Sequence, residues 1–183
     1  PRRCIIIGPS HTGSWLPWSL AAEGSYRTPL GEVPVDAACA EALRARCPFL
    51  ATDAWAQQGE HAIEVLVPFL QYRGPSDLTI VPIVMASSDT EERRQLADAL
   101  AQVIRMQEDP TLLIASTDLS HYEPQAAGAL HDRQLIEAIC ALDPEALTRL
   151  VRERELIMCG AGAAACVLSA ATQLGARRGR LVQ

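Results

Sequence analysis

Residues 4–11 read Cys-Ile-Ile-Ile-Gly-Pro-Ser-His. A short, unbroken β-branched run that ends in Gly-Pro is typical of a strand buried in a parallel sheet. Similar apolar runs cover residues 78–84 and 111–115. Gly-Pro leads the chain out of the first run into a loop at the carboxyl edge of the sheet, where α/β proteins place their ligand-binding loops. This stretch therefore predicts both a core strand and a loop suited to a functional site.

Helical patterns alternate with these strands, and several begin at a residue suited to cap a helix. Asp36, the Ser88-Asp89 pair and Asp143 precede three of them, and Gly175 ends the last. The expected helices cover residues 36–46, 60–72, 90–106, 126–140, 144–154 and 160–174. Strands that alternate with helices of this length predict a layered α/β domain around a mostly parallel sheet.

Length and composition fit one globular domain over residues 1–183. A hydrophobic content of 49% is enough for a sizeable core. The chain has 16 basic and 22 acidic residues, a net charge of −6 and no basic block, which argues against a nucleic-acid partner. No apolar run is long enough to span a membrane, and no secretory signal precedes the first strand. We therefore expect a cytoplasmic protein without a membrane segment.

Both ends of the chain are abrupt. Three residues lead straight into the first core strand, and residues 180–183 have the pattern of another strand that is just beginning. No repeat or linker divides the sequence. We therefore expect a single domain that is a fragment, lacking an N-terminal segment and the C-terminal end of a longer protein.

The histidines stand in the most informative positions. His11 directly follows the first strand, and His121 follows the third in the loop Ser116-Thr117-Asp118-Leu119-Ser120-His121-Tyr122. A single histidine in such a loop is as often an ordinary surface residue as it is a functional one. Two of them at the carboxyl ends of two strands would meet over the same edge of the sheet. This placement favours a shared functional site.

The segment Glu60-His61-Ala62-Ile63-Glu64 places His61 and Glu64 one helical turn apart. It can contribute to a pocket, or it can be a solvated helix start with acidic residues near the positive end of the helix dipole. The sequence is not H-E-x-x-H, which excludes a zinc protease of that type. His131 and Asp132 fit an ordinary surface or interface pair.

Six cysteines without C-x-x-C spacing argue against a disulfide framework and for buried thiols, Cys166 among them. Cys159 differs because it precedes Gly160 at a helix start, where the dipole stabilises a thiolate. It is a candidate nucleophile or soft-metal ligand, with a buried structural cysteine as the alternative. Trp15, Trp18 and Trp55 are candidates for a buried interface or a pocket wall.

Five separated motifs in one order resemble the MEMO-like family, whose prokaryotic members are called AmmeMemoRadiSam system protein B. The resemblance covers residues 4–183. The motifs are Gly8-Pro9-Ser10-His11, Thr28-Pro29-Leu30-Gly31, Glu60-His61-x-Ile63-Glu64 with Val67-Pro68-Phe69-Leu70-Gln71, Ser116-x-Asp118-Leu119-Ser120-His121-Tyr122, and Cys159-Gly160. This family is similar in fold to the class III extradiol dioxygenases, which have a central sheet with helices on both faces.

The resemblance implies a metal site for iron(II) or copper. His11 and Cys159 are the implied ligands, and a further ligand histidine is expected upstream of this chain. His121 takes the acid/base position, with Asp118 or Tyr122 to orient it. The remaining candidates are substrate-binding or supporting groups: Ser10, Glu60, His61, Glu64 and Ser120.

Three functions follow as hypotheses. The first is a redox-related iron or copper protein, an oxidoreductase of open substrate. The second is a non-catalytic module that binds a peptide or protein, with an AMMECR-type protein and a radical-SAM enzyme as the implied partners. The third is a hydrolase with Cys159 as nucleophile and His121 as base.

Overall fold

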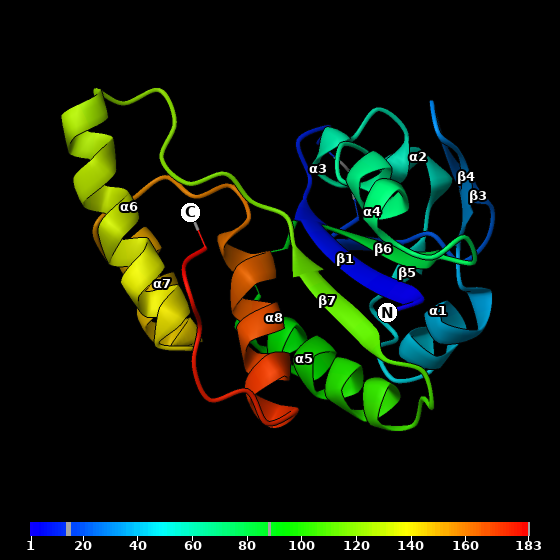
Figure 1. Ribbon diagram of the computed structural model, residues 1–183. Helices are drawn as coiled ribbons and strands as arrows, with labels where there is room; N and C mark the ends of the chain where they lie inside the picture. Colours follow the sequence, from blue (N-terminus) through cyan, green and yellow to red (C-terminus); the bar gives the residue numbers. More distant parts are fainter. Residues whose placement is uncertain (14–15, 88, 183) are drawn as a thin grey trace.

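The computed structural model describes residues 1–13, 16–87 and 89–182. Its centre is a five-stranded sheet in the order β5-β2-β6-β1-β7 (Figure 1). The strands are β1 (Arg3–Pro9), β2 (Trp18–Leu20), β5 (Ala51–Thr52), β6 (Thr79–Met85) and β7 (Thr111–Ala115). β1 runs parallel to both β6 and β7, whereas β2 is antiparallel to β6. The predicted α/β fold with a mostly parallel sheet is confirmed.

Strand β1 is the centre of the fold because its side chains alternate between two buried layers. Ile5 and Ile7 belong to one hydrophobic cluster, and Cys4 and Ile6 belong to another on the opposite face. A strand covered on both faces needs apolar residues at every position, which accounts for the unbroken run.

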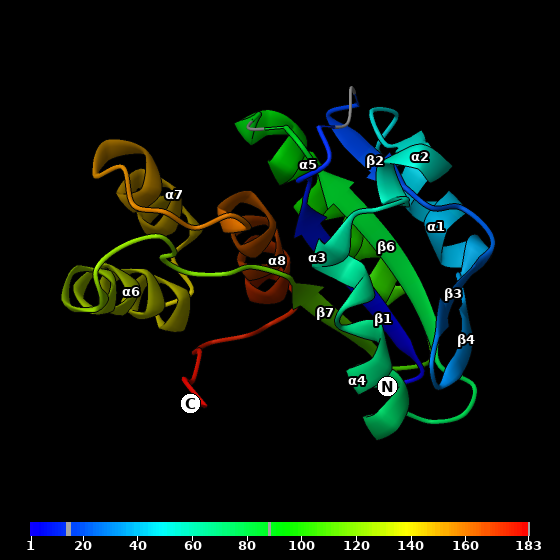
Figure 2. The same cartoon turned by 90° about the horizontal axis from the view of Figure 1, so that it is seen from above.

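Helices cover both faces of this sheet (Figures 1 and 2). The cluster that contains Ile5 includes residues of three helices, α1 (Ala37–Arg44), α5 (Thr90–Arg105) and α8 (Ala161–Gln173), besides residues of the sheet. The opposite cluster includes Ile63 of α3 (His61–Glu64) and Val67 of α4 (Val67–Arg73). The remaining elements are the hairpin of β3 (Ser25–Thr28) and β4 (Gly31–Pro34), and the helices α2 (Ala54–Gln57), α6 (Gln125–Cys140) and α7 (Pro144–Glu153).

Helices α6 and α7 form an outer layer. They pack beyond α8 through a separate hydrophobic cluster that includes Leu135, Leu147 and Leu168. Figure 2 shows this layer on the side of α8 that faces away from β1. The outer layer is thus held to the sheet through α8. None of the described helices combines the length and the apolar content that a membrane span needs.

The predicted helix caps are largely confirmed. The carboxylates of Asp36, Asp89 and Asp143 accept hydrogen bonds from backbone N–H groups in the first turns of α1, α5 and α7. Gly175 adopts a φ of 101° just after α8, a left-handed conformation that glycine favours. Ser88 lies outside the described residues.

Two expectations were wrong. Residues 60–72 form two short helices instead of one, because Pro68 has no N–H to donate to the carbonyl of Glu64 and interrupts the hydrogen-bond ladder. Residues 180–182 form no strand. Instead, the N–H of Gly179 donates to the Cys140 carbonyl at 2.8 Å, which ties this segment to the end of α6.

The tryptophans have different environments. Trp18 is fully buried in β2, and its indole N–H donates to Glu92 at 2.7 Å, so it belongs to the core. Trp55 on α2 is 79% exposed, and Trp15 lies outside the described residues. All six cysteines are free, and Cys4, Cys39, Cys47 and Cys166 are buried as predicted.

We expect Ile5→Ala to destabilise the protein by about 2–5 kcal/mol, because it opens a cavity in the fully buried central strand. Leu112→Ala on the edge strand β7 is the matched control, since Leu112 is 41% exposed. Urea unfolding of both variants measures the difference. Equal losses would contradict the central role of β1.

Candidate metal centre

The loop after β1 brings His11 to the start of α3. The amide of Ser10 donates to the Met85 carbonyl at 3.0 Å, which keeps this loop beside the end of β6. Gly8 permits the close approach to α3, because a Cβ at this position would lie 2.9 Å from the Cβ of Ala62. A glycine is therefore needed at this position of the Gly-Pro-Ser-His motif for steric reasons.

Glu60 is the centre of this group. Its side chain is 1% exposed, and Glu60 is one of the few buried polar residues of the described chain. One carboxylate oxygen, Oε1, accepts from the ring Nδ1 of His11 at 2.8 Å and from the Ala62 amide at 2.9 Å. The other, Oε2, accepts from the backbone N–H of His11. Glu60 thus caps α3 and at the same time fixes both the backbone and the ring of His11.

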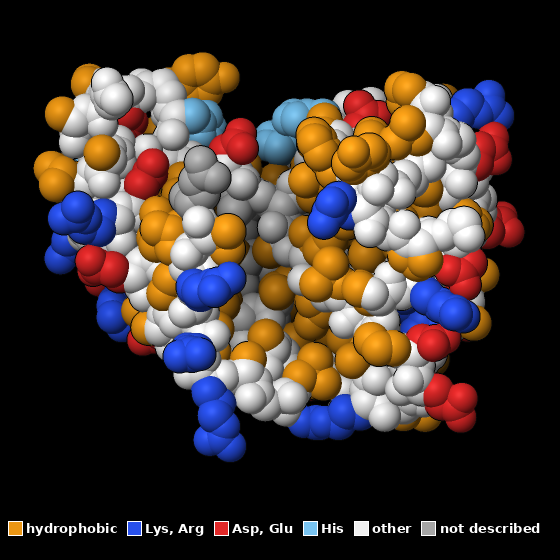
Figure 3. Space-filling model, in the orientation of Figure 1, with side chains coloured by type: hydrophobic (Ala, Val, Ile, Leu, Met, Phe, Trp, Pro, Cys, Tyr) orange, Lys and Arg blue, Asp and Glu red, His pale blue; other side chains and the backbone are white. Residues whose placement is uncertain are grey.

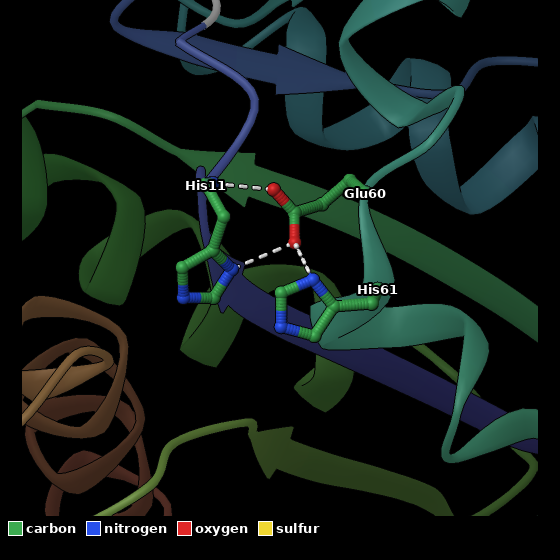
Figure 4. A group of neighbouring side chains, drawn as sticks. All are labelled: His11, Glu60 and His61. Atoms are coloured by element: carbon green, nitrogen blue, oxygen red, sulfur yellow. Dashed lines mark hydrogen bonds and ion pairs between the residues drawn. The ribbon is translucent and has the colours of Figure 1, made fainter. Parts of the chain in front are cut away.

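His61 completes the group on the other side of the carboxylate. Its Nδ1 lies 3.5 Å from Oε1 of Glu60, and its ring stacks on that of His11 with centroids 4.4 Å apart and planes at 23°. Figure 4 shows the carboxylate between the two Nδ1 atoms, with the Nε2 atoms turned away from it. The His11 and His61 side chains are 34% and 61% exposed, so solvent can reach them.

The environment keeps Glu60 ionised. Burial raises the pKa of its carboxyl, but the hydrogen bonds from the His11 ring, the His11 amide and the Ala62 amide, with the nearby His11 charge, outweigh it and lower the pKa below the usual value. An ionised carboxylate accepts the Nδ1 proton of His11. The lone pair of His11 is then on Nε2, the arrangement that a carboxylate commonly imposes on a metal-binding histidine.

These residues fit a metal ion. One ligand atom from each of His11, Glu60 and His61 lies within 4.8 Å of the others. Two imidazoles and a carboxylate suit iron, copper and related transition metals. The sequence predicted His11 as a ligand and gave Glu60 and His61 supporting roles. The sequence therefore placed the three near one pocket, but it did not predict Glu60 and His61 as possible ligands, because that depends on how deeply Glu60 is buried.

Cys159 lies beside the loop that follows β7. Its Sγ accepts from the Asp118 amide at 3.1 Å and lies 3.9 Å from Oγ1 of Thr117. Gly160 allows this contact, since a Cβ there would lie 2.2 Å from the Ser116 carbonyl oxygen. Cys159 is half-buried and precedes α8 as predicted, but it is not part of the cluster formed by His11, Glu60 and His61.

The loop from Ser116 to Tyr122 holds His121 through the backbone. The Leu119 carbonyl lies 2.9 Å from Nδ1 of His121. Because a carbonyl can only accept, Nδ1 carries a proton, and in the neutral ring Nε2 then has the lone pair that a general base needs. Tyr122 contacts the His121 ring edge-on at 5.0 Å, is 99% exposed and has a φ of 62°, which is rare for a tyrosine.

The other predicted site residues occupy different surroundings. Ser10 and Cys159 line one cavity of about 600 Å³. The amide of Ser120 donates to Asp132 at 2.9 Å, and His131 pairs with Glu123 at 2.8 Å, so both side chains on α6 hold the His121 loop. The Glu64 and Asp118 side chains are exposed. Figure 3 shows histidines on both sides of a hollow above the ends of β1 and β7.

Fold and site together define an α/β protein with a candidate transition-metal site at the carboxyl edge of its sheet. A family model described as "Memo-like protein" matches residues 1–183. The chain belongs to this family, as its motifs predicted.

The names of curated relatives support the same family assignment. A "MEMO1 family protein" of Methanopyrus kandleri is 37% identical over 183 residues, which is 100% of this chain and 65% of the relative. One of Thermotoga maritima is 38% identical over 170 residues, 92% of this chain and 60% of the relative. One of Caldivirga maquilingensis is 37% identical over 163 residues, 89% of this chain and 57% of the relative. The chain thus spans less than two thirds of the length of these relatives.

We expect Glu60→Gln to reduce stability by about 1–3 kcal/mol at neutral pH with EDTA present, because a charge-assisted hydrogen bond is replaced by a weaker one. The folded-state pKa of Glu60 is lowered, so its ionised form stabilises the fold above the unfolded pKa, near 4.5, and this contribution is lost as the pH falls through the folded pKa.

Urea unfolding from pH 7 to pH 3 measures this dependence. The difference between wild type and Glu60→Gln is expected to shrink below about pH 4.5, the usual value for a glutamate. Glu64→Gln, which changes an exposed glutamate of the same helix, is the control and should behave as wild type. A gap that stays constant with pH would contradict the role of the Glu60 charge.

Proposed function

We propose that this protein binds iron(II) or copper through His11 and His61 with the support of Glu60, and that it works as a redox-related metalloprotein. The observation that carries the proposal is the Glu60 carboxylate, 1% exposed and within 3.5 Å of both imidazole Nδ1 atoms. Burying a charged group costs desolvation free energy, and folded proteins tolerate such a group when it is well paired. Here the pairing orients two metal-binding side chains.

The residues divide into two roles. His11 and His61 present neutral imidazoles, and Glu60 is either a third ligand or the group that fixes their protonation. Two imidazoles and one carboxylate form the donor set of many non-haem iron enzymes, and they leave coordination positions open. Iron or copper held there supplies one-electron redox chemistry that no side chain of this protein provides by itself.

The family resemblance adds Cys159 as a ligand. A half-buried thiol beside the Ser116–Tyr122 loop supports this role, because loops at this edge of the sheet converge. A thiolate would favour copper(I) or a soft iron site over a hard cation. His121, with its lone pair on Nε2, is the proposed general base for a substrate in the adjoining cavity, and Ser10 is proposed to contact that substrate.

A second candidate is a module that binds a peptide or a protein. Large hydrophobic side chains are exposed on the surface, among them Trp55 at 79%, Phe69 at 71% and Tyr122 at 99%. Exposed aromatic residues are common in protein interfaces. The proposed partners are an AMMECR-type protein and a radical-SAM enzyme, which the family name implies.

Metal analysis tests the first proposal. We expect the anaerobically purified protein to bind iron(II) or copper near one equivalent, and His11→Ala to abolish most of it. Glu60→Gln should weaken binding about 10–100-fold, the usual cost of losing a group that orients a ligand. His131→Ala, which changes a histidine paired with Glu123, is the matched control and should bind as wild type. Equal metal binding by wild type and all variants would refute the proposed metal site.

Oxygen uptake separates the enzyme from the binding module. With the metal-loaded protein and a panel of phenolic compounds, an oxidoreductase should consume dioxygen, and His121→Ala should reduce the rate by about 100-fold or more. The metal content of this variant should stay unchanged. Binding of the proposed partners that survives removal of the metal, with no oxygen uptake, would favour the binding module instead.

A further inference from the structure

A cavity lined by arginine side chains lies between α5, α7 and the start of α8, beside the ends of β1 and β6. The cavity of about 600 Å³ that begins at Ser10 and Cys159 is lined further along by Thr90 and Arg93 of α5 and by Arg152 of α7. A second hollow of about 320 Å³ shares these last three residues and adds Arg94 and Arg149. The two hollows therefore adjoin and form one groove.

The helices around this groove are fixed by packing. α8 contacts both α5 and α7, and Figure 2 shows it near the N-terminal end of α5 with α7 on its other side. The first turn of α8, residues 160–163, lines the same cavity. Arg93 and Arg152, which lie far apart in the sequence, are thus held on the same groove by the contacts of α8.

The charges in this groove are only partly neutralised. Arg94 pairs with Glu91 at 2.7 Å and with Asp98 at 3.2 Å, and Arg152 pairs with its exposed neighbour Glu153 at 3.2 Å. Within the described parts of the chain, neither Arg93 nor Arg149 forms an ion pair with a carboxylate. Glu145 is the acidic side chain among the described residues that line the two hollows.

This excess of positive charge is unusual for the molecule, which has a net charge of −6. Four arginines line the two hollows, Arg93, Arg94, Arg149 and Arg152, against one carboxylate, that of Glu145. Of these, Arg94 already pairs with Glu91 and Asp98. The guanidinium group has a planar set of donors that matches the oxygens of a carboxylate or a phosphate. An anion in the groove would offset the mutual repulsion of these side chains.

The polar and apolar parts of the cavity are separate. Met85, Ala86, Val151, Ala161 and Ala163 provide apolar surface in the same cavity as the arginines and Cys159. The hydroxyl of Thr148 already donates to backbone carbonyls of its own helix, so the arginines are the main donors at the far end. A ligand that fits both parts has an anionic group at one end and a small apolar body.

We propose that this cavity binds a small organic anion, with its carboxylate or phosphate group at Arg93 and Arg152 and its apolar body toward Ser10 and Cys159. Arg149 adds to the positive potential at the outer end of the groove. This cavity is the one that the proposed function assigns to the substrate, so the inference rests on that proposal for the role of Ser10 and Cys159. The anion-binding arginines themselves belong to α5 and α7 and not to the cluster around Glu60.

Calorimetric titration tests the proposal, with phenyl phosphate and benzoate as probes at constant ionic strength and with EDTA present. We expect saturable binding of at least one probe at one site per chain. Arg93→Gln and Arg152→Gln should each weaken it by about tenfold or more, as expected for the loss of a hydrogen bond to a charged group. Tighter binding of phenyl phosphate would identify a phosphate ester, and tighter binding of benzoate a carboxylate.

Arg133→Gln is the matched control. Arg133 is an exposed residue of α6 outside the groove, and its loss changes the net charge by the same amount. This variant should bind the probe as wild type does. Two results would overturn the proposal: no saturable binding of either probe by the folded wild-type protein, or the same loss of affinity in all three variants. Because EDTA removes metal, neither result depends on the metal site.

Discussion

The ionised carboxylate of Glu60 is the interaction on which the site depends. It lies between the loop after β1 and the start of α3, and it accepts hydrogen bonds from both segments. Its desolvation is unfavourable and is offset only when all of these donors are in place. The position of His11 is therefore coupled to the packing of α3 on the sheet. That packing in turn requires Gly8, since a Cβ there would collide with Ala62.

The sequence predicted the parts of the fold that depend on local patterns. Ile5 to Ile7 are apolar at every position because β1 is covered on both faces, and Asp36, Asp89 and Asp143 cap helices because their side chains accept from nearby amides. The short strands β2 and β5 and the β3-β4 hairpin were missed. All of them are too brief to show a period, and β2 also pairs with strands that are distant in sequence, β5 and β6.

The site, like the fold, was predicted only where local patterns indicate it. His11 and His121 could be placed at one edge of the sheet because the carboxyl ends of parallel strands meet there. The role of Glu60 could not be derived from spacing, since the same segment fits a solvated helix start. Only the tertiary structure shows that this glutamate is buried against His11, whereas Glu64, one turn later, is exposed. Likewise, nothing local to Arg93 or Arg152 indicates that both face one cavity.

The metal centre and the charged cavity depend on different contacts, and this separation has a consequence for specificity. His11 and Glu60 are positioned by β1 and α3, at the end of the sheet. Arg152 is positioned by α7, which packs on α8 through the cluster that α6 and α7 share with it. Substitutions in that outer layer are therefore expected to move or remove the proposed anion-binding groups without disturbing the proposed metal ligands. Gly160 matters for the cavity in another way, because a Cβ at this residue would collide with the Ser116 carbonyl oxygen and disturb both the start of α8 and the contact of Cys159 with Asp118.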